Sequence, residues 1–186
     1  GFEGDVLVLN GDVPLLSDAL VQRLLTTHAE SRAVATAVTT RLADPSGYGR
    51  VLRDRRGGFR GIVEEVEATS AERRVKEINA GIYCFSAPRL FEALHQVRPS
   101  AVKGELYLPE VLAILLKEKG RIATVLADDA REVLGINTRA ELAEAVDGPA
   151  EPPAGRLDAE VEPQPVGHDR HVLDQRAGVC HQRRRG

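Results

Sequence analysis

Apolar residues occur along this chain in short continuous runs that alternate with segments of helical periodicity. The first run, at residues 6 to 9, holds four aliphatic side chains and ends in Asn10-Gly11-Asp12. Such a run is typical of a strand buried on both faces, as in parallel sheets. Asn-Gly also occurs in hairpin turns, but no alternating strand follows it here. We therefore expect a parallel strand with Asp12 just past its carboxyl end.

The rest of the pattern alternates between strands and helices. Ser17 is a candidate cap for a first helix, and His28 near its end is expected to be solvated or favoured by the helix dipole rather than to be a ligand. Strands are expected at residues 33 to 40, 51 to 53, 59 to 66, 78 to 86 and 122 to 126. Helices are expected at residues 18 to 28, 88 to 97, 107 to 119 and 138 to 146, and the apolar face of the second should carry Leu90, Phe91, Leu94 and Val97. This alternation predicts an α/β domain with a mostly parallel sheet and a small antiparallel insertion near residues 49 to 66.

Composition narrows the class of protein. The formal net charge is −3, so no bulk basicity points to nucleic acid. No apolar run approaches the roughly 20 residues that span a bilayer, and no signal peptide is visible. The two cysteines, Cys84 and Cys180, give no disulfide framework, and Cys84 lies in an apolar run typical of a core strand. These features predict a protein of the reducing cytoplasm.

The composition changes at residue 147. Residues 147 to 186 hold five prolines, five glycines and six arginines, with only six Leu or Val, so they cannot bury enough apolar surface to order themselves. We expect a domain at residues 1 to 146 and a disordered or frameshifted tail beyond it. The tail carries His168, His171, Cys180 and His181, whose spacing matches no standard four-ligand zinc pattern.

Asp12 is the residue whose position predicts chemistry most directly. In open α/β sheets, ligands bind at the carboxyl edge of the strands. A carboxylate there can hold a divalent cation against a phosphate, although most turn carboxylates only cap or solvate.

Six short segments together resemble one family. They are LNGDVPL at 9 to 15, DPSGYGR at 44 to 50, GIVEE at 61 to 65, EINAGIY at 77 to 83, GELYL at 104 to 108 and GINTR at 135 to 139. In this order they resemble the uridylyltransferase domain of the bacterial bifunctional N-acetylglucosamine-1-phosphate uridyltransferase/glucosamine-1-phosphate acetyltransferase family. The resemblance covers residues 1 to about 146.

The resemblance implies a fold and an activity. The fold is a Rossmann-like nucleotide-diphospho-sugar transferase fold. The reaction joins UTP and N-acetylglucosamine 1-phosphate into UDP-N-acetylglucosamine and pyrophosphate, on the route to bacterial cell wall and lipopolysaccharide. The cofactor would be Mg²⁺, and the partners would be these small molecules rather than nucleic acid or membrane.

The resemblance also implies roles for particular residues. Asp12 and Asn137 would hold the catalytic Mg²⁺, while Asn10 and Gly11 would line the nucleotide-sugar site. Gly49, Glu64 and Asn79 correspond to sugar-binding positions. Taken singly, each of these residues is equally compatible with a turn, a cap or a solvated strand edge.

The sequence also departs from the family pattern. The Gly-rich phosphate loop with its basic residues, the uracil contacts and the hexapeptide repeats that carry the family's trimer contacts are not found. Leu106 and Pro109-Glu110 stand where the family often has Tyr and Thr-Asp. We therefore expect an N-terminally truncated domain with little activity of its own. Another sugar-1-phosphate nucleotidyltransferase, a non-catalytic sugar-nucleotide-binding module and a pseudogene product stay open as alternatives.

Overall fold

The computed structural model describes residues 2–102, 104–136, 138, 139 and 142. They belong to a compact unit that spans Gly1–Ala150. The expected tail at 147 to 186 lies outside the described residues, as does most of the helix expected at 138 to 146. Within the described part, no helix combines the length and the apolar character that a bilayer crossing requires.

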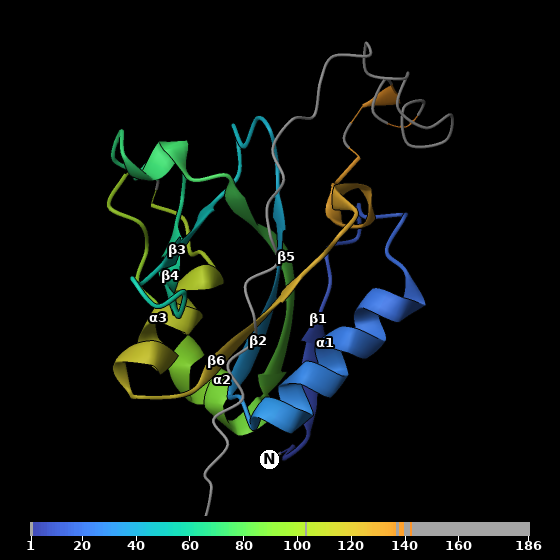
Figure 1. The fold of residues 1–186 in the computed structure, drawn as a ribbon. Helices are drawn as coiled ribbons and strands as arrows, with labels where there is room; N and C mark the ends of the chain where they lie inside the picture. The colour runs from blue at the N-terminus through green and yellow to red at the C-terminus, as the bar shows by residue number, and fades with distance from the viewer. Residues whose placement is uncertain (1, 103, 137, 140–141, 143–186) are drawn as a thin grey trace, which may run out of the picture. The chain divides into compact units, whose positions relative to one another are not determined.

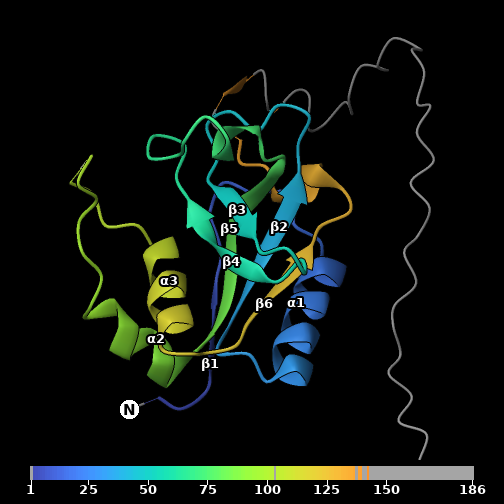
Figure 2. The ribbon, with the colours of Figure 1, turned by 60° about the vertical axis from the view of Figure 1, so that its left-hand side comes forward.

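The described strands form one sheet with helices on both faces (Figures 1 and 2). Helix α1 covers one face, and α2 and α3 cover the other. The elements are β1 (Asp5–Val8), α1 (Asp18–Ser31), β2 (Ala35–Arg41), β3 (Arg50–Arg53), β4 (Phe59–Val63), the 3₁₀ turn η1 (Glu72–Arg74), β5 (Glu77–Ser86), α2 (Ala87–Leu94), α3 (Pro109–Lys117), β6 (Ile122–Leu126) and η2 (Ala130–Val133).

Strand direction differs from the expectation. The order is β4-β3-β5-β2-β6, with β1 also paired to β5. Among the described strands, β2 and β6 form the parallel pair, and the other pairings are antiparallel. The prediction of a mostly parallel sheet was therefore wrong, although the mixed α/β class and the antiparallel β3–β4 hairpin are confirmed. A continuous apolar run reports burial and carries no information about the direction of the neighbouring strand.

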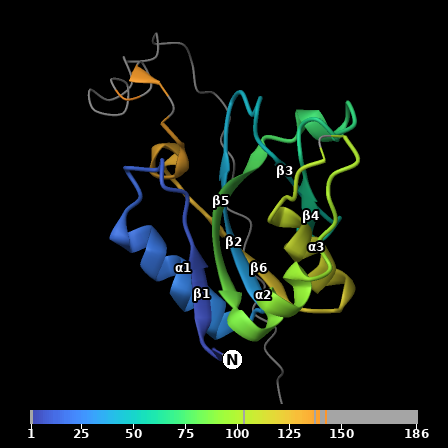
Figure 3. The same cartoon turned by 180° about the vertical axis from the view of Figure 1, so that it is seen from behind.

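Strand β1 is the clearest case of this misreading. It runs antiparallel to β5, and its residues alternate between exposed and half-buried, so it is not buried on both faces. Figure 3 shows β1 beside β5 from behind. Leu7 is 37% exposed. The aliphatic run thus marks a strand that has a single described neighbour.

Alternation along β2 and β5 divides the core into two layers. Ala35, Ala37, Tyr83 and Phe85 pack against α2 and α3, whereas Val38, Ile82 and Cys84 pack against α1. Cys84 is a buried free thiol, as expected, and burial raises its pKa to about 11. The two layers hold β5 at the centre of the unit.

Helix ends follow their sequence signals, but two side-chain expectations fail. The Ser17 hydroxyl accepts the Leu20 N–H at 3.1 Å, which confirms the predicted cap. His28 is only 4% exposed, so it is not solvated, although it does lie in the last turn of α1, where the helix dipole favours a histidine. The face of α2 is narrower than predicted, because Phe91 is 51% exposed while Leu90 is buried.

An irregular bulge interrupts β5. The register with β2 shifts so that three residues of β5, 80 to 82, face the single residue Val38 between the pairs Ala37–Tyr83 and Thr39–Asn79. Gly81 adopts a φ of +73° inside this bulge. Bulges of this kind redirect side chains and are frequent beside active sites. The regular alternation of side chains along β5 is therefore interrupted at Gly81.

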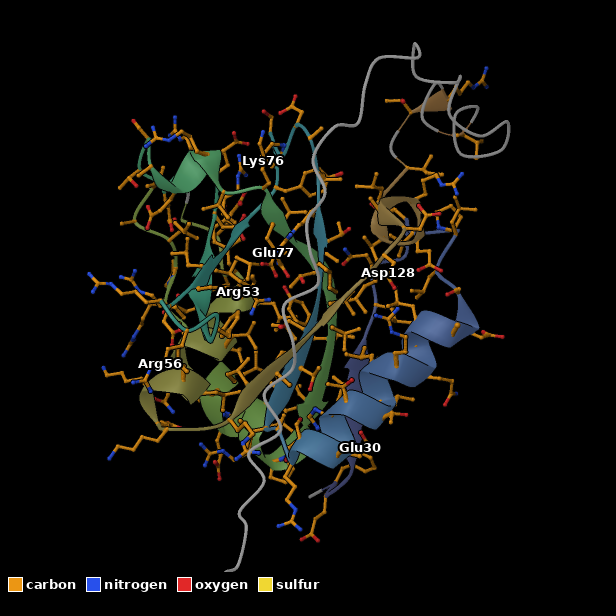
Figure 4. The ribbon with its side chains drawn as sticks, in the orientation of Figure 1. Glu30, Arg53, Arg56, Lys76, Glu77 and Asp128 are labelled. Atoms are coloured by element: carbon orange, nitrogen blue, oxygen red, sulfur yellow. The ribbon has the colours of Figure 1, made fainter. Side chains whose placement is uncertain are left out.

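An ion pair joins β3 to β5 near the amino end of β5, with Glu77 buried and Arg53 half-buried. Figure 4 shows Arg53 of β3 and Glu77 of β5 near one another. Their side chains form two hydrogen bonds, with Nε–Oε2 at 2.8 Å and Nη2–Oε1 at 2.5 Å. Burial raises the pKa of Glu77, but the hydrogen bonds from Arg53 and Thr39, together with the positive charges of Arg53 and Arg41, outweigh burial and bring the pKa below 4.5.

We predict that Glu77→Gln lowers the free energy of unfolding by about 1–3 kcal/mol at pH 7, because it leaves the Arg53 guanidinium without its anion. Since the folded-state pKa of Glu77 lies below 4.5, the stabilisation is complete above about pH 4.5 and is lost as the pH falls through that folded-state value. Urea denaturation at several pH values measures both effects. Asp128→Asn, in an exposed pair with Arg23, is the control and should change stability by less than about 1 kcal/mol. An acid-side slope that Glu77→Gln leaves unchanged would contradict the prediction.

Candidate functional site

The candidate site lies along one edge of β5, at the bulge. Strand β2 follows one edge of β5 on both sides of the bulge, so β1 and β3 share the other edge. β1 pairs with residues 83 to 86, and β3 pairs at Ile78. The two strands thus diverge around residues 79 to 82. The loop that follows β1 and the loop that precedes β3 both contact β5 in this interval.

The loop after β1 is held against the bulge. The Asn10 side-chain amide donates to the Ala80 carbonyl at 3.5 Å. Asn10 also lies where a Cβ on Gly81 would project, so the glycine makes room for it. The structure therefore brings Asn10 to β5 as the resemblance implies.

Asp12 lies beside a segment from the far end of the described chain. Its carbonyl accepts the Ile136 N–H at 2.9 Å. A Cβ at Gly135 would come within 2.5 Å of Asp12 Oδ2, so this glycine leaves room for the carboxylate. Asp12 is exposed, so its oxygens are open to a ligand. Asn137 itself lies outside the described residues.

The three residues expected to bind the sugar lie close together, although they come from three different parts of the chain. The Asn79 N–H donates to the Gly49 carbonyl at 2.9 Å. A Cβ on Gly49 would lie 3.1 Å from Glu64 Oε1, a contact tight enough to push the carboxylate away. Gly49 precedes β3, Glu64 follows β4 and Asn79 lies on β5, so the hairpin and the central strand together assemble this group.

Sequence reasoning missed the residue that fixes Asn79. The Tyr83 hydroxyl lies 2.6 Å from Nδ2 and 2.9 Å from Oδ1 of Asn79. The Gly81 N–H also donates to Oδ1, at 3.3 Å. Burial raises the pKa of Tyr83 far above 10, and the nearby charge of Glu64 raises it further. Tyr83 therefore stays neutral and can orient the Asn79 amide. The i, i+4 spacing gave no signal, because a regular strand would put these residues too far apart.

Two more polar residues without a predicted role surround the site. Tyr107 donates to Glu105 at 2.9 Å, and this bond, with the charges of Glu64 and Glu67, raises the pKa of Tyr107 to about 12. The segment before α3 therefore lies within electrostatic reach of Glu64. Arg50 is 1% exposed, donates to the Tyr48 carbonyl and lies 3.5 Å from Glu65, whose carboxylate also accepts the Gly47 N–H. This network holds the loop that carries Gly49.

The model of the nucleotidyl transferase family matches residues 1–132, which include most of this site. The chain belongs to the nucleotidyl transferase family. Among its curated relatives, this nucleotidyl transferase is 43% identical over 143 residues to the bifunctional protein GlmU of Syntrophomonas wolfei, and 46% identical over 140 residues to that of Heliobacterium modesticaldum. These matches cover 77% and 75% of the chain but only 32% and 31% of the relatives, so the chain spans about a third of their length.

Solved structures confirm the fold of the nucleotidyl transferase. A Bacillus anthracis protein assigned as a glucose-1-phosphate thymidylyltransferase, in complex with sucrose, aligns with a TM-score of 0.58 at 18% identity, covering 83% of this chain and 58% of that one. A UDP-glucose pyrophosphorylase complexed with UDP-glucose aligns with a TM-score of 0.50 at 14% identity, covering 66% and 49%. At these identities the likeness concerns the fold alone.

We predict that Gly81→Ala destabilises this nucleotidyl transferase more than Gly57→Ala does. Both glycines have a positive φ, +73° and +81°, so both alanines carry strain of about 1–2 kcal/mol. Only the Cβ at Gly81 would also displace Asn10, since the Cβ at Gly57 meets open space. Urea denaturation gives the difference in stability, and amide NMR shifts near Ala80 report the displacement of Asn10. Equal losses of stability in the two variants would contradict the role given to Gly81.

Proposed function

We propose that this chain carries the sugar-nucleotide site of a uridylyltransferase that joins UTP and N-acetylglucosamine 1-phosphate into UDP-N-acetylglucosamine and pyrophosphate. The proposal rests on its membership of the nucleotidyl transferase family and on its similarity to GlmU proteins. The observation that carries it is the convergence of Gly49, Glu64 and Asn79 beside the Asp12 loop, along the bulged edge of β5. We assign this domain to residues 1 to 146, apart from a tail at 147 to 186.

In the proposed reaction, a phosphate oxygen of the sugar phosphate attacks the α-phosphorus of UTP. The bond between that phosphorus and the bridging oxygen breaks, and pyrophosphate leaves with the electron pair. No protein nucleophile is needed, so the residues contribute positioning and electrostatics. Mg²⁺, when bound, neutralises charge on the phosphates.

The residues near Asp12 fit such an ion. Asp12 offers an exposed, hard anionic oxygen, and its carboxylate occupies the place that a Cβ at Gly135 would take. We propose that Asn137, which follows Gly135 and Ile136 in sequence, adds a neutral amide oxygen. Mg²⁺ keeps several waters, so two protein ligands are sufficient. Asn10 and Gly11, in the same loop, would line the nucleotide side of the site.

The group around Asn79 fits the sugar. We propose that an acetamido or hydroxyl group of the sugar approaches the backbone at Gly49, which carries no Cβ to keep it away. Glu64 can accept hydrogen bonds from sugar hydroxyls, and the Asn79 amide can donate and accept. Tyr83 holds that amide in place, which reduces the ordering cost of binding.

The cellular role follows from the proposed product. UDP-N-acetylglucosamine feeds peptidoglycan and lipopolysaccharide synthesis, so we assign the reaction to the cytoplasm. We also propose that a longer protein of this kind assembles as a trimer through an acetyltransferase region, as the family resemblance implies.

We predict that Asp12→Asn removes the Mg²⁺-dependent part of the affinity for N-acetylglucosamine 1-phosphate. The loss of an anionic ligand should weaken binding by about tenfold or more in the presence of Mg²⁺, and far less without it. Isothermal titration calorimetry with and without Mg²⁺ measures the difference. Asp128→Asn removes one exposed carboxylate elsewhere and should bind as the wild type does. A response to Mg²⁺ that Asp12→Asn leaves intact would exclude Asp12 as the metal ligand.

We predict that the unmodified chain prefers N-acetylglucosamine 1-phosphate over glucose 1-phosphate, and that Gly49→Ala removes this preference. A Cβ at Gly49 would press on Glu64 Oε1, at 3.1 Å, and would occupy space beside the acetamido group. We expect affinity for the acetamido sugar to fall about tenfold, and affinity for glucose 1-phosphate to change less. Competition NMR with the two sugars tests this. Stronger binding of glucose 1-phosphate by the unmodified chain would instead favour another sugar-1-phosphate nucleotidyltransferase.

A further inference from the structure

Three side chains with different ligand chemistry meet at the end of β1 opposite the Asp12 loop. Asp5 begins β1, His28 lies in the last turn of α1, and Cys84 lies on β5. The carboxylate oxygen, the imidazole nitrogen and the thiol sulfur all lie within 4.8 Å of one another. Among the described residues, this is the group of three whose ligand atoms come so close. The proposed nucleotidyl transfer makes no use of it.

The sheet register explains why these side chains meet. Leu7 of β1 and Thr36 of β2 are the direct partners of Cys84 on its two sides, so the three form a row across one face of the sheet. Asp5 lies two residues before Leu7 and therefore projects from the same face. Helix α1 covers this face and brings His28 over the row. The arrangement therefore depends on strand pairing and on the packing of α1 against the sheet.

The histidine ring is oriented for a ligand at Nε2. His28 Nδ1 lies 2.9 Å from Thr36 Oγ1, and Nε2 lies 3.5 Å from Asp5 Oδ1. Metal-binding histidines commonly use the second ring nitrogen for such a hydrogen bond, which fixes the ring and its tautomer. His28 is 4% exposed and Cys84 is fully buried, whereas the Asp5 side chain is 55% exposed. The cluster is thus buried on two sides and open to solvent on the third.

We propose that Asp5, His28 and Cys84 form a binding site for a zinc-like divalent transition-metal ion. A tetrahedral zinc ion with one nitrogen and one oxygen ligand places those two atoms about 3.3 Å apart, close to the observed 3.5 Å between His28 Nε2 and Asp5 Oδ1. Sulfur and nitrogen donors select zinc and its neighbours over Mg²⁺, which requires oxygen. The fourth position faces the exposed side of Asp5 and would take a water.

Charge also favours this occupant. A carboxylate, a thiolate and a neutral imidazole together carry two negative charges, which one divalent ion cancels. On binding, the thiol proton leaves to the buffer and the sulfur–metal bond forms. Through coordinate bonds, the metal would link β1, α1 and β5 at a point where β1 has a single described neighbour. A gain in thermal stability is therefore expected on loading.

The test is a titration of the metal-free, reduced 186-residue chain with Co²⁺, which replaces zinc and reports on its own ligands. We expect one Co²⁺ per chain, a thiolate-to-cobalt charge-transfer band in the near ultraviolet and the visible d–d bands of a four-coordinate ion. Zn²⁺ should remove these bands in competition, and excess Mg²⁺ should not. Zn²⁺ should also raise the Tm of the chain.

Variants separate this site from rival ligands. Cys84→Ser should remove the charge-transfer band, whereas Cys180→Ser should retain it, which excludes the Cys180-His181 pair. His28→Gln should weaken Co²⁺ binding and His95→Gln should not, because His95 is exposed and its ring bonds to the Phe91 carbonyl of α2. Thr36→Val, which removes only the orienting hydroxyl, should weaken it about 10–100-fold.

Asp5→Asn provides a variant that should fold even if the buried substitutions do not, because this side chain is largely exposed. It should weaken Co²⁺ binding at least tenfold and reduce the rise in Tm with Zn²⁺. A thiolate band that persists in Cys84→Ser, affinity unchanged in Asp5→Asn, or no thiolate band in the unmodified chain would each overturn the proposal. None of these outcomes depends on nucleotidyl transfer, so the two proposals can fail separately.

Discussion

The irregular stretch of β5 is the constraint on which the rest of this structure depends. Three strands pair with β5, two of them on a single edge, and the backbone deviates between Asn79 and Tyr83, in the interval between these two strands. Gly81 makes the deviation possible, since its φ of +73° is costly for a residue with a Cβ. The same deviation places Asn79 and Tyr83 in hydrogen-bond contact and admits Asn10. One local break in periodicity therefore brings Asn10, Asn79 and Tyr83 together at this edge of the sheet.

Around this break, the structure separates groups that fix the backbone from groups left open to ligands. Arg50, Glu65 and Tyr83 make their hydrogen bonds within the protein and hold the loops in place. Asp12 is exposed, in the loop after β1. Arg50 and Tyr83 are buried, where electrostatic interactions are less screened. Their hydrogen bonds are made within the protein, so they hold the loops while the exposed groups stay available to a ligand. This division is what a reaction driven by positioning requires.

The sequence predicted the elements well, and their mutual directions poorly. The Ser17 cap, the β3–β4 hairpin and the apolar face of β5 all follow from local signals. The antiparallel pairing of β1 with β5 does not, because an aliphatic run is compatible with either direction. The burial of His28 was missed for a similar reason: its position near a helix end favours solvation, whereas packing of α1 on the sheet buries it. The contact between Asn79 and Tyr83 depends on a bulge, and no propensity of single residues encodes it.

Among the described strands, β1 is secured by one hydrogen-bonded ladder, although it leads directly into the loop of Asn10 and Asp12. Segments held on a single side open more readily than segments held on both, so amide exchange should be faster in β1 than in β5. Any ligand that grips the loop after β1 must then restrain the strand as well, and part of its binding free energy is used to suppress that opening. In this fold, the binding of a ligand to the loop after β1 and the rigidity of β1 therefore report on the same equilibrium.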